Sequence, residues 1–150
     1  MRTIPVKKIA GVARLRLVTI GTDTLLVQVA RMLSDAHISL VIVCDSNGVM
    51  VGVITKTDIV QQIGVSCESI NVAVAKEVMT PDVTSCRPTD SLLDVLAKME
   101  KLGLTHIPVI GDDFKPSGVV NSGDALRALM ADEKYEAALL RDYVMGVGYQ

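Results

Sequence analysis

The sequence is poor in aromatic residues and contains no tryptophan. Aromatic side chains make up 3% of the 150 residues, whereas hydrophobic residues make up 49%. The interior must therefore be built from aliphatic side chains and methionine, which pack closely in sheets and helices. A chain of this length can form one compact domain or two half-sized lobes that share a core.

Long uncharged stretches are also missing. The mean hydropathy is +0.40, yet the longest runs without Asp, Glu, Lys or Arg contain ten residues, at 46–55 and 102–111. A helix needs about 20 apolar residues to cross a bilayer, so these runs predict no membrane span. The N-terminal MRTIPVKKIAGVARLRL has no continuous apolar stretch and no small-residue cleavage site, which argues against a secretory signal. We therefore expect a cytoplasmic protein with no membrane partner.

Blocks of like charge and paired cysteines are absent from the sequence as well. Fifteen basic and seventeen acidic residues give a formal charge of −2, so we expect no nucleic acid partner. Cys44, Cys67 and Cys86 are odd in number and form no CxxC pair. They predict neither a disulfide framework nor a zinc site, and they are expected to be buried or incidental thiols in a reducing compartment. No metal site is expected.

One heptapeptide pattern is present twice. GVITKTD occupies 52–58 and GVVNSGD occupies 118–124, a spacing of sixty-six residues. The second copy has Asn121 where the first has Thr55. Sliding the sequence against itself by the same sixty-six residues also superposes Leu26 on Leu92, Val29 on Val95 and Val43 on Val109, with no gap. The chain therefore contains an internal repeat.

Each copy of the repeat predicts the same succession of elements. Apolar residues at helical spacing indicate an amphipathic helix of about a dozen residues, at 26–33 and again at 92–99. Ser91, with Asp94 three residues later, resembles a capping box. Two aliphatic runs separated by a turn then predict a hairpin, and a second helix opens at Asp58 and at Asp124. The runs lie at 39–44 and 49–54 in the first copy, and at 106–110 and 117–120 in the second.

The predicted unit is therefore strand, helix, strand, strand, helix, written twice around a linker near residues 64–75. A three-stranded sheet covered on one side leaves apolar surface exposed, so the two copies of this α+β unit should pack sheet to sheet about a pseudo-twofold axis. One lobe alone should be unstable. Helical spacing continues from 124 to 145, and this long C-terminal helix could pack on the protein's own lobes or on a second subunit.

Over residues 4–130 the sequence resembles a tandem pair of cystathionine beta-synthase (CBS) domains. The resemblance is carried by the doubled heptapeptide and by KEVMTPDVTSCRPTDSLLDVLAKMEKLGLTHIPVI in the second half, with its VMTP, DSL and LTHIPVI segments. It implies one CBS repeat at 4–66, a second at 67–130, and a C-terminal helical extension at 131–150. The second repeat is the better match, because the first has GVAR at 11–14 in place of VMTP.

The resemblance implies a free-standing, non-catalytic regulatory module. Members of this family commonly bind AMP, ADP, ATP, NAD or S-adenosylmethionine in the cleft between the two repeats. Such a module requires no cofactor, and we expect a homodimer that acts on a protein partner. The sequence has no GxSxG, P-loop or HExxH motif, and His37 and His106 are its only histidines, so catalysis is not expected.

Asp58 and Asp124 are the candidate ribose ligands. An ionised carboxylate can accept hydrogen bonds from both ribose hydroxyls, and a helix N-terminus beside it favours a phosphate. Aspartate in the first turn of a helix is also a common cap, and Thr55 or Asn121 could cap as well. His106 could face phosphate as a cation or could be an ordinary half-buried residue.

The residues that the family's binding motif implies come from both repeats. Ser39 and Leu40 in the first repeat, and Thr105 and His106 in the second, are expected to form the wall opposite the motif. The full set expected at the nucleotide site is Ser39, Val53, Thr55, Lys56, Thr57, Asp58, Thr84, Thr105, His106, Ile107, Pro108, Val119, Asn121 and Asp124.

The sequence departs from the family in its basic residues. Many nucleotide-binding members carry arginine immediately before the motif aspartate, where this chain has Thr57 and Gly123. Lys56, Arg87, Arg14 and Arg16 remain, and we expect them to be solvated surface charges. This weak phosphate neutralisation favours an alternative function, in which the protein is a ligand-free scaffold that dimerises and presents its C-terminal helix to a partner.

Overall fold

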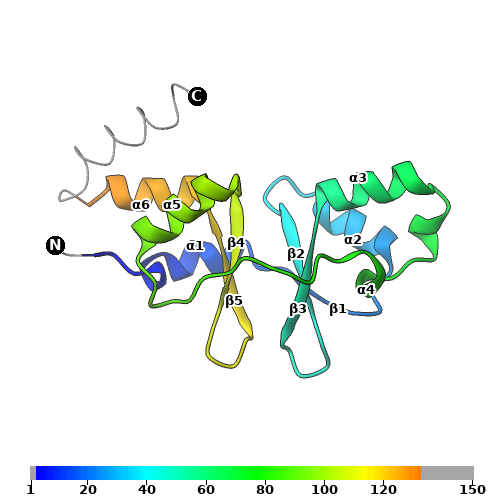
Figure 1. The fold of residues 1–150 in the computed structure, drawn as a ribbon, viewed down its shortest axis with the longest axis horizontal. Coiled ribbons are helices and arrows are strands. Elements are labelled where there is room, and N and C mark those ends of the chain that lie inside the picture. The colour runs from blue at the N-terminus through cyan, green and yellow to red at the C-terminus, as the bar shows by residue number, and fades with distance from the viewer. Residues whose placement is uncertain (1–2, 133–150) are drawn as a thin grey trace.

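The computed structural model describes residues 3–132, which form two lobes side by side (Figure 1). The first lobe contains β1 (Thr19–Gly21), α2 (Leu26–Leu33), β2 (Leu40–Cys44), β3 (Met50–Thr55) and α3 (Lys56–Val65). The second contains α5 (Leu92–Leu102), β4 (His106–Ile110), β5 (Pro116–Asn121) and α6 (Ser122–Met130). Short helices precede each lobe in sequence: η1 (Val6–Ile9) and α1 (Ala10–Leu15), then η2 (Ser69–Asn71) and α4 (Ala75–Val78). The predicted α+β repeat is confirmed.

The hairpins of the two sheets pair their strands in the same register, but the first sheet has three strands and the second has two. In the first lobe β1 pairs with β2 in parallel and β2 with β3 antiparallel. In the second lobe β4 and β5 are antiparallel, and the expected strand before α5 is reduced to one parallel bridge between Cys86 and Val109. That bridge lies sixty-six residues after the Ile20 to Val43 pair of β1 and β2. In the first lobe the Ile42 N–H donates to the Val18 carbonyl at 2.9 Å. The equivalent of Ile42 is Pro108, which has no N–H to form that bond, and this explains the shorter strand.

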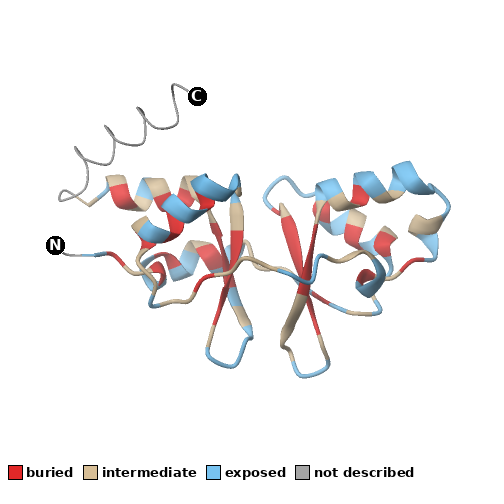
Figure 2. Cartoon of the chain, viewed as in Figure 1, coloured by how far each residue is buried: buried red, intermediate tan, exposed pale blue. Residues whose placement is uncertain are grey.

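Buried residues are concentrated on the strands and on parts of the helices of both lobes (Figure 2), and they form core clusters on both sides of each sheet. On the outer side, the apolar stripes of α2 and α5 pack against their own strands, as the helical spacing predicted. On the inner side, Leu40, Ile42 and Val53 of the first lobe pack with Val119 of the second. All four side chains are buried. The two sheets therefore face each other, as predicted.

Each lobe packs against a segment from elsewhere in the chain. The segment before the first lobe's strands lies on the second lobe, and the segment before the second lobe's strands lies on the first. We call residues 4–16 the N-terminal arm and residues 70–82 the linker arm. The N-terminal arm lies on the second lobe, where Leu92 N–H donates to the Ile4 carbonyl at 2.7 Å. The linker arm lies on the first lobe, where Leu26 N–H donates to the Ala73 carbonyl at 3.0 Å. The two lobes thus exchange their entry segments.

The repeated glycine of the heptapeptide allows each arm to approach its sheet. A Cβ atom on Gly118 would lie 2.8 Å from the Ala13 Cβ, and a Cβ atom on Gly52 would lie 2.9 Å from the Thr80 carbonyl oxygen. Both distances are too short for a side chain, so only glycine fits there. Gly52 and Gly118 are sixty-six residues apart, and so are Ala13 and the neighbouring Met79. The glycine is therefore repeated because the arm contact is repeated.

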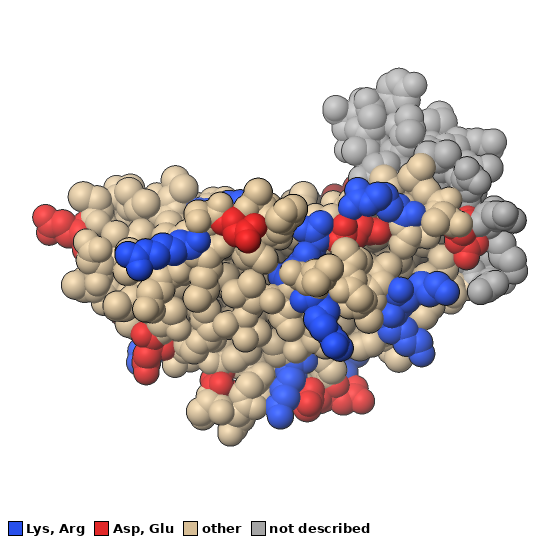
Figure 3. All heavy atoms as spheres, turned by 180° about the vertical axis from the view of Figure 1, so that it is seen from behind, with Lys and Arg blue, Asp and Glu red and all other residues tan. Residues whose placement is uncertain are grey.

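The C-terminal extension expected at 131–150 lies outside the described residues, apart from its first two. Within residues 3–132, no helix is both long enough and apolar enough to cross a membrane. The same part of the chain contains no cluster of three or more His, Cys, Asp or Glu side chains arranged to hold a metal ion. On the face drawn in Figure 3, acidic and basic side chains are interspersed.

Candidate functional site

The first copy of the heptapeptide ends β3 and begins α3. Thr55 is the N-cap, and its hydroxyl accepts from the Asp58 N–H at 3.3 Å. The Asp58 carboxylate accepts in return from the Thr55 N–H at 2.9 Å through Oδ2. The helix thus opens at Lys56, two residues before the predicted start, and Asp58 is its third residue. Among the described residues Asp58 Oδ1 has no hydrogen-bond partner, so this carboxylate both caps the helix and keeps one oxygen for another donor.

Asp58 lines a cleft of about 240 Å³ between the lobes, which we call the first cleft. Its walls come from both lobes and from the end of the linker arm. Apolar side chains and polar groups both face into it, as in small-molecule sites generally. The lining residues are Leu40, Val53, Thr55 and Asp58 of the first lobe, Thr80, Asp82, Val83 and Thr84 of the linker arm and the chain after it, and Leu104, His106 and Pro108 of the second lobe.

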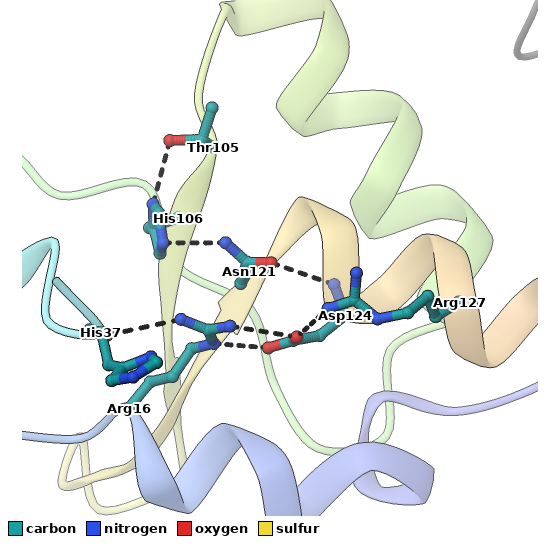
Figure 4. Close-up of polar contacts among 7 residues, drawn as sticks. All are labelled: Arg16, His37, Thr105, His106, Asn121, Asp124 and Arg127. Atoms are coloured by element: carbon teal, nitrogen blue, oxygen red, sulfur yellow. Dashed lines mark hydrogen bonds and ion pairs between the residues drawn. The ribbon is translucent and has the colours of Figure 1, made fainter.

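The second copy of the heptapeptide ends β5 and begins α6 in the same way. Asn121 is the N-cap, and its amide oxygen accepts from the Asp124 N–H at 3.0 Å. Unlike the Asp58 carboxylate, the Asp124 carboxylate contacts two arginine side chains (Figure 4). It accepts from Arg16 Nε at 2.5 Å, from Arg16 Nη2 at 3.1 Å and from Arg127 Nη2 at 2.7 Å. Two guanidinium groups therefore neutralise it.

Burial and charge act together on Asp124. The residue is only 6% exposed. The hydrogen bond from Arg16 lowers the pKa of the carboxyl below its ordinary value, while burial opposes that shift. Asp124 is therefore ionised and fully paired at neutral pH.

Arg16 connects the two lobes, contrary to its predicted role as a solvated surface charge. Besides its two bonds to Asp124, it donates Nη1 to the His37 carbonyl of the first lobe at 3.3 Å. That prediction was wrong because α1 packs on β5 and thereby places Arg16 at the start of α6. Arg16 and Asp124 lie 108 residues apart, so no local pattern reveals the pair.

His106 is held as a neutral ring. The Asn121 amide oxygen is engaged by the Asp124 N–H, so its amide nitrogen donates to His106 Nε2 at 2.9 Å. The other ring nitrogen, Nδ1, lies 2.9 Å from the Thr105 hydroxyl. Burial, followed by the nearby charge of Arg16, lowers the pKa of His106 below 6.5. Of the two interpretations from sequence, these contacts favour the half-buried neutral residue over a cation that faces phosphate.

The structure brings six of the fourteen predicted site residues into the first cleft. Asn121 and Asp124 lie instead at the second motif, Lys56 and Thr57 are exposed on the first turn of α3, and Ser39 is half-buried before β2. Ile107 and Val119 are buried in the core, and Thr105 contacts His106. The six that line the cleft are Val53, Thr55, Asp58, Thr84, His106 and Pro108. Which of the fourteen contact a ligand stays a prediction.

Sequence reasoning missed several residues that shape the two motifs. Thr80, Asp82, Val83 and Leu104 line the first cleft, and Arg16 covers the second motif. The sequence did contain a signal for Arg16 and Asp82. Asp82 lies sixty-six residues after Arg16, so the internal repeat places both at equivalent positions beside a motif aspartate.

Comparison with known proteins identifies the fold family. The model of the CBS domain matches the chain twice, at residues 6–64 and at residues 75–131. The chain belongs to the CBS domain family. Among curated relatives, this CBS pair is 27% identical over 141 residues to an uncharacterized 17.7 kDa protein of Acidianus ambivalens, covering 94% of this chain and 84% of that one.

Other curated relatives are much longer proteins. The CBS pair is 27% identical over 104 residues to a homoserine O-acetyltransferase of Methanobrevibacter ruminantium, covering 69% of this chain. It spans only 20% of that relative's length.

Solved structures of CBS pairs share the arrangement of the two lobes. The CBS domain pair of protein MJ0100, in complex with 5'-methylthioadenosine and S-adenosyl-L-methionine, superposes with a TM-score of 0.69 at 23% identity, covering 87% of this chain and 98% of that chain. CBSX2 in complex with AMP superposes with a TM-score of 0.71 at 21% identity, covering 85% and 96%; CBSX2 comes from Arabidopsis thaliana.

Proposed function

We propose that this CBS pair is a non-catalytic regulatory module that binds an adenosyl ligand in the first cleft. The observation that carries the proposal is the carboxylate of Asp58, which lines the cleft with one oxygen not engaged by any residue in 3–132. The ligands named for MJ0100 and CBSX2 support it, because all of them contain adenosine. The other expectations, a homodimer, a regulated protein partner and a cytoplasmic location, belong to the same proposal.

The lining of the first cleft suits each part of an adenosine. The two ribose hydroxyls donate to Asp58 Oδ1, and the charge on the carboxylate strengthens both bonds. The apolar side chains of Val53 and Pro108, contributed by opposite lobes, pack against the adenine ring. A ligand held in this way touches both lobes at once.

Contact with both lobes is what makes the module regulatory. A ligand that fits one arrangement of the lobes better than another shifts the population toward that arrangement, by no more than its difference in affinity for the two. A partner protein that senses the angle between the lobes would then respond to the ligand concentration.

Calorimetric titration of the purified protein tests this proposal. 5'-Methylthioadenosine, S-adenosylmethionine, AMP, ATP and NAD are titrated into the wild type and into Asp58→Asn, which is expected to lose at least tenfold in affinity. Asp94→Asn is the matched control, because Asp94 occupies the same position at the start of α5 with Ser91 as its cap, outside the first cleft. The absence of binding for all five ligands would overturn the proposal and favour the ligand-free scaffold.

A further inference from the structure

The two arms place residues of opposite charge at equivalent positions, sixty-six residues apart, one near each motif aspartate. Asp82 of the linker arm is exposed and lines the first cleft together with Asp58, and Arg16 of the N-terminal arm pairs with Asp124. The residue equivalent to Arg127, which also pairs with Asp124, is Gln61 in the first lobe. The first cleft therefore gathers negative charge, whereas the second motif is neutralised.

We infer that Asp82 makes the first cleft selective for adenosyl ligands that carry no phosphate, such as adenosine thioethers and sulfonium compounds. This inference rests on the proposed function. The lining of the cleft includes two carboxylates, Asp58 and Asp82, and no lysine or arginine among the described residues. His106 is its only other titratable group, and the contacts of that ring keep it neutral. Lys56 lies on the first turn of α3, outside the lining, and its exposed ammonium is a cation beyond the cleft that acts on His106.

Coulomb's law then orders the ligands by charge. A phosphate dianion in the cleft meets the charge of Asp82 with no side-chain cation of the lining to balance it. Because Asp82 is exposed, salt screens this repulsion. A methylthio group at the same position has no charge to repel. The sulfonium and ammonium groups of S-adenosylmethionine are attracted to the carboxylate. The shared adenosine supplies the binding contacts, and the charge at the 5' group decides the order of affinity among the ligands.

The test compares 5'-methylthioadenosine with AMP, which differ at the 5' group, by calorimetry at low and high salt. In the wild type, methylthioadenosine is expected to bind at least tenfold more tightly than AMP, with a smaller preference at high salt. Asp82→Asn should reduce that preference by about tenfold by improving AMP binding. Asp23→Asn, which removes an exposed carboxylate on the linker-arm side of the first lobe, should leave it unchanged.

Two results would overturn the inference while leaving the proposed function standing. One is a wild type that prefers AMP, and the other is an Asp82→Asn variant that keeps the full preference for methylthioadenosine. The absence of binding for both ligands would overturn the proposed function and this inference with it.

A different observation, the pairing of Asp124, leads to a second inference. We propose that Arg16 closes the second motif, so that each chain binds one adenosyl ligand. Both oxygens of Asp124 already accept from guanidinium groups, and the residue is almost fully buried. A ribose could reach this carboxylate only by displacing Arg16. That displacement would also break the bond from Arg16 to the His37 carbonyl of the first lobe.

The stoichiometry of binding tests this second inference. With 5'-methylthioadenosine as the titrant, the wild type should bind one molecule per chain, and Asp124→Asn should not weaken that binding. Arg16→Gln should expose a second, weaker site, whereas Arg14→Gln, an exposed position on the same arm, should not. Two molecules per wild-type chain would overturn the inference, as would loss of the wild-type site in Asp124→Asn. Neither of these results depends on the folding of the Arg16 variant.

Discussion

At the scale of single residues, the two motif aspartates have the same place in the repeat and different chemistry. Asp58 and Asp124 are both the third residue of a helix and both follow a side chain that caps it. One keeps an oxygen facing the first cleft, and the other is buried under Arg16 and Arg127. The heptapeptide therefore defines the geometry of the helix start, and residues elsewhere in the chain define what the carboxylate can do.

The ion pair between Arg16 and Asp124 predicts a pH-dependent contribution to stability. Because the pKa of Asp124 in the folded protein lies below its ordinary value of 3.8, the contribution is present above that pH and is lost as the pH falls through the folded-state pKa. Arg16→Gln should lower the free energy of unfolding by about 2 kcal/mol at pH 7, with Arg127 still present as a partner. Urea unfolding at pH 7 and pH 3 should show the difference shrink in acid.

Arg87→Gln is the control for that measurement. Arg87 pairs with Asp112 at 2.6 Å, but the Asp112 side chain is fully exposed. Exposed pairs contribute little, so this variant should lose much less stability than Arg16→Gln at pH 7. Equal losses in the two variants would contradict the structural role assigned to Arg16.

His106 predicts a specific tautomer. Its Nε2 accepts from the Asn121 amide, so the proton of the neutral ring should reside on Nδ1. Because its pKa is lowered in the folded state, the ring should resist protonation until the pH is below 6.5, and stability should decline below that pH. Nitrogen NMR of the imidazole checks both points. A proton on Nε2 at pH 7, or a titration midpoint above 6.5, would show that the hydrogen bonds are arranged differently.

At the scale of elements, the exchanged arms explain which parts of the fold the sequence predicts. The helical stripes, the hairpins and the repeat follow from local periodicity, and the structure confirms them. The contact of Ala13 with Gly118 and the pair of Arg16 with Asp124 join residues more than a hundred positions apart. Local patterns carry no information on such contacts, so the sequence led us to expect Arg16 in solvent. The sixty-six-residue repeat could have shown that Arg16 and Asp82 are equivalent positions. It could not have shown which aspartate Arg16 binds.

The contacts of the arms with the sheets predict that some glycines tolerate substitution by alanine and others do not. Gly118→Ala should destabilise the protein by about 1–3 kcal/mol, because the new Cβ would overlap Ala13 of α1. Gly64→Ala is the matched control, since a Cβ there meets nothing within 4 Å and lies inside α3. It should be neutral or stabilising by up to about 1 kcal/mol, the usual advantage of alanine over glycine in a helix. Urea unfolding compares them, and equal stability would contradict the close approach of α1 to β5.

At the scale of the whole molecule, the exchange of arms ties the two lobes into one unit. Residues 17–80 contain the strands of the first lobe together with most of the linker arm that packs on them. Residues 4–66, the predicted first repeat, contain instead the arm that packs on the second lobe. We propose that 17–80 is the structural unit of the first lobe, although its inner sheet face would still lack the other lobe.

The two fragments should therefore differ when they are expressed separately. Residues 17–80 should retain more helical and strand content by circular dichroism than residues 4–66, and both should be far less stable than the whole chain. The reason is that the 4–66 fragment leaves the apolar face against Ala73 and Ala75 uncovered, although both residues are buried in the whole chain. Equal content in the two fragments would argue against the exchange of arms.

The most direct test of the central claim, that the first cleft holds the adenosyl ligand, is amide NMR of the whole chain during titration with 5'-methylthioadenosine. The largest shifts should fall on Thr55 to Asp58 and on the chain around Asp82, with the amides of Asn121 to Asp124 far less affected. Shifts concentrated at Asn121 to Asp124, or no shifts at saturating ligand, would contradict it.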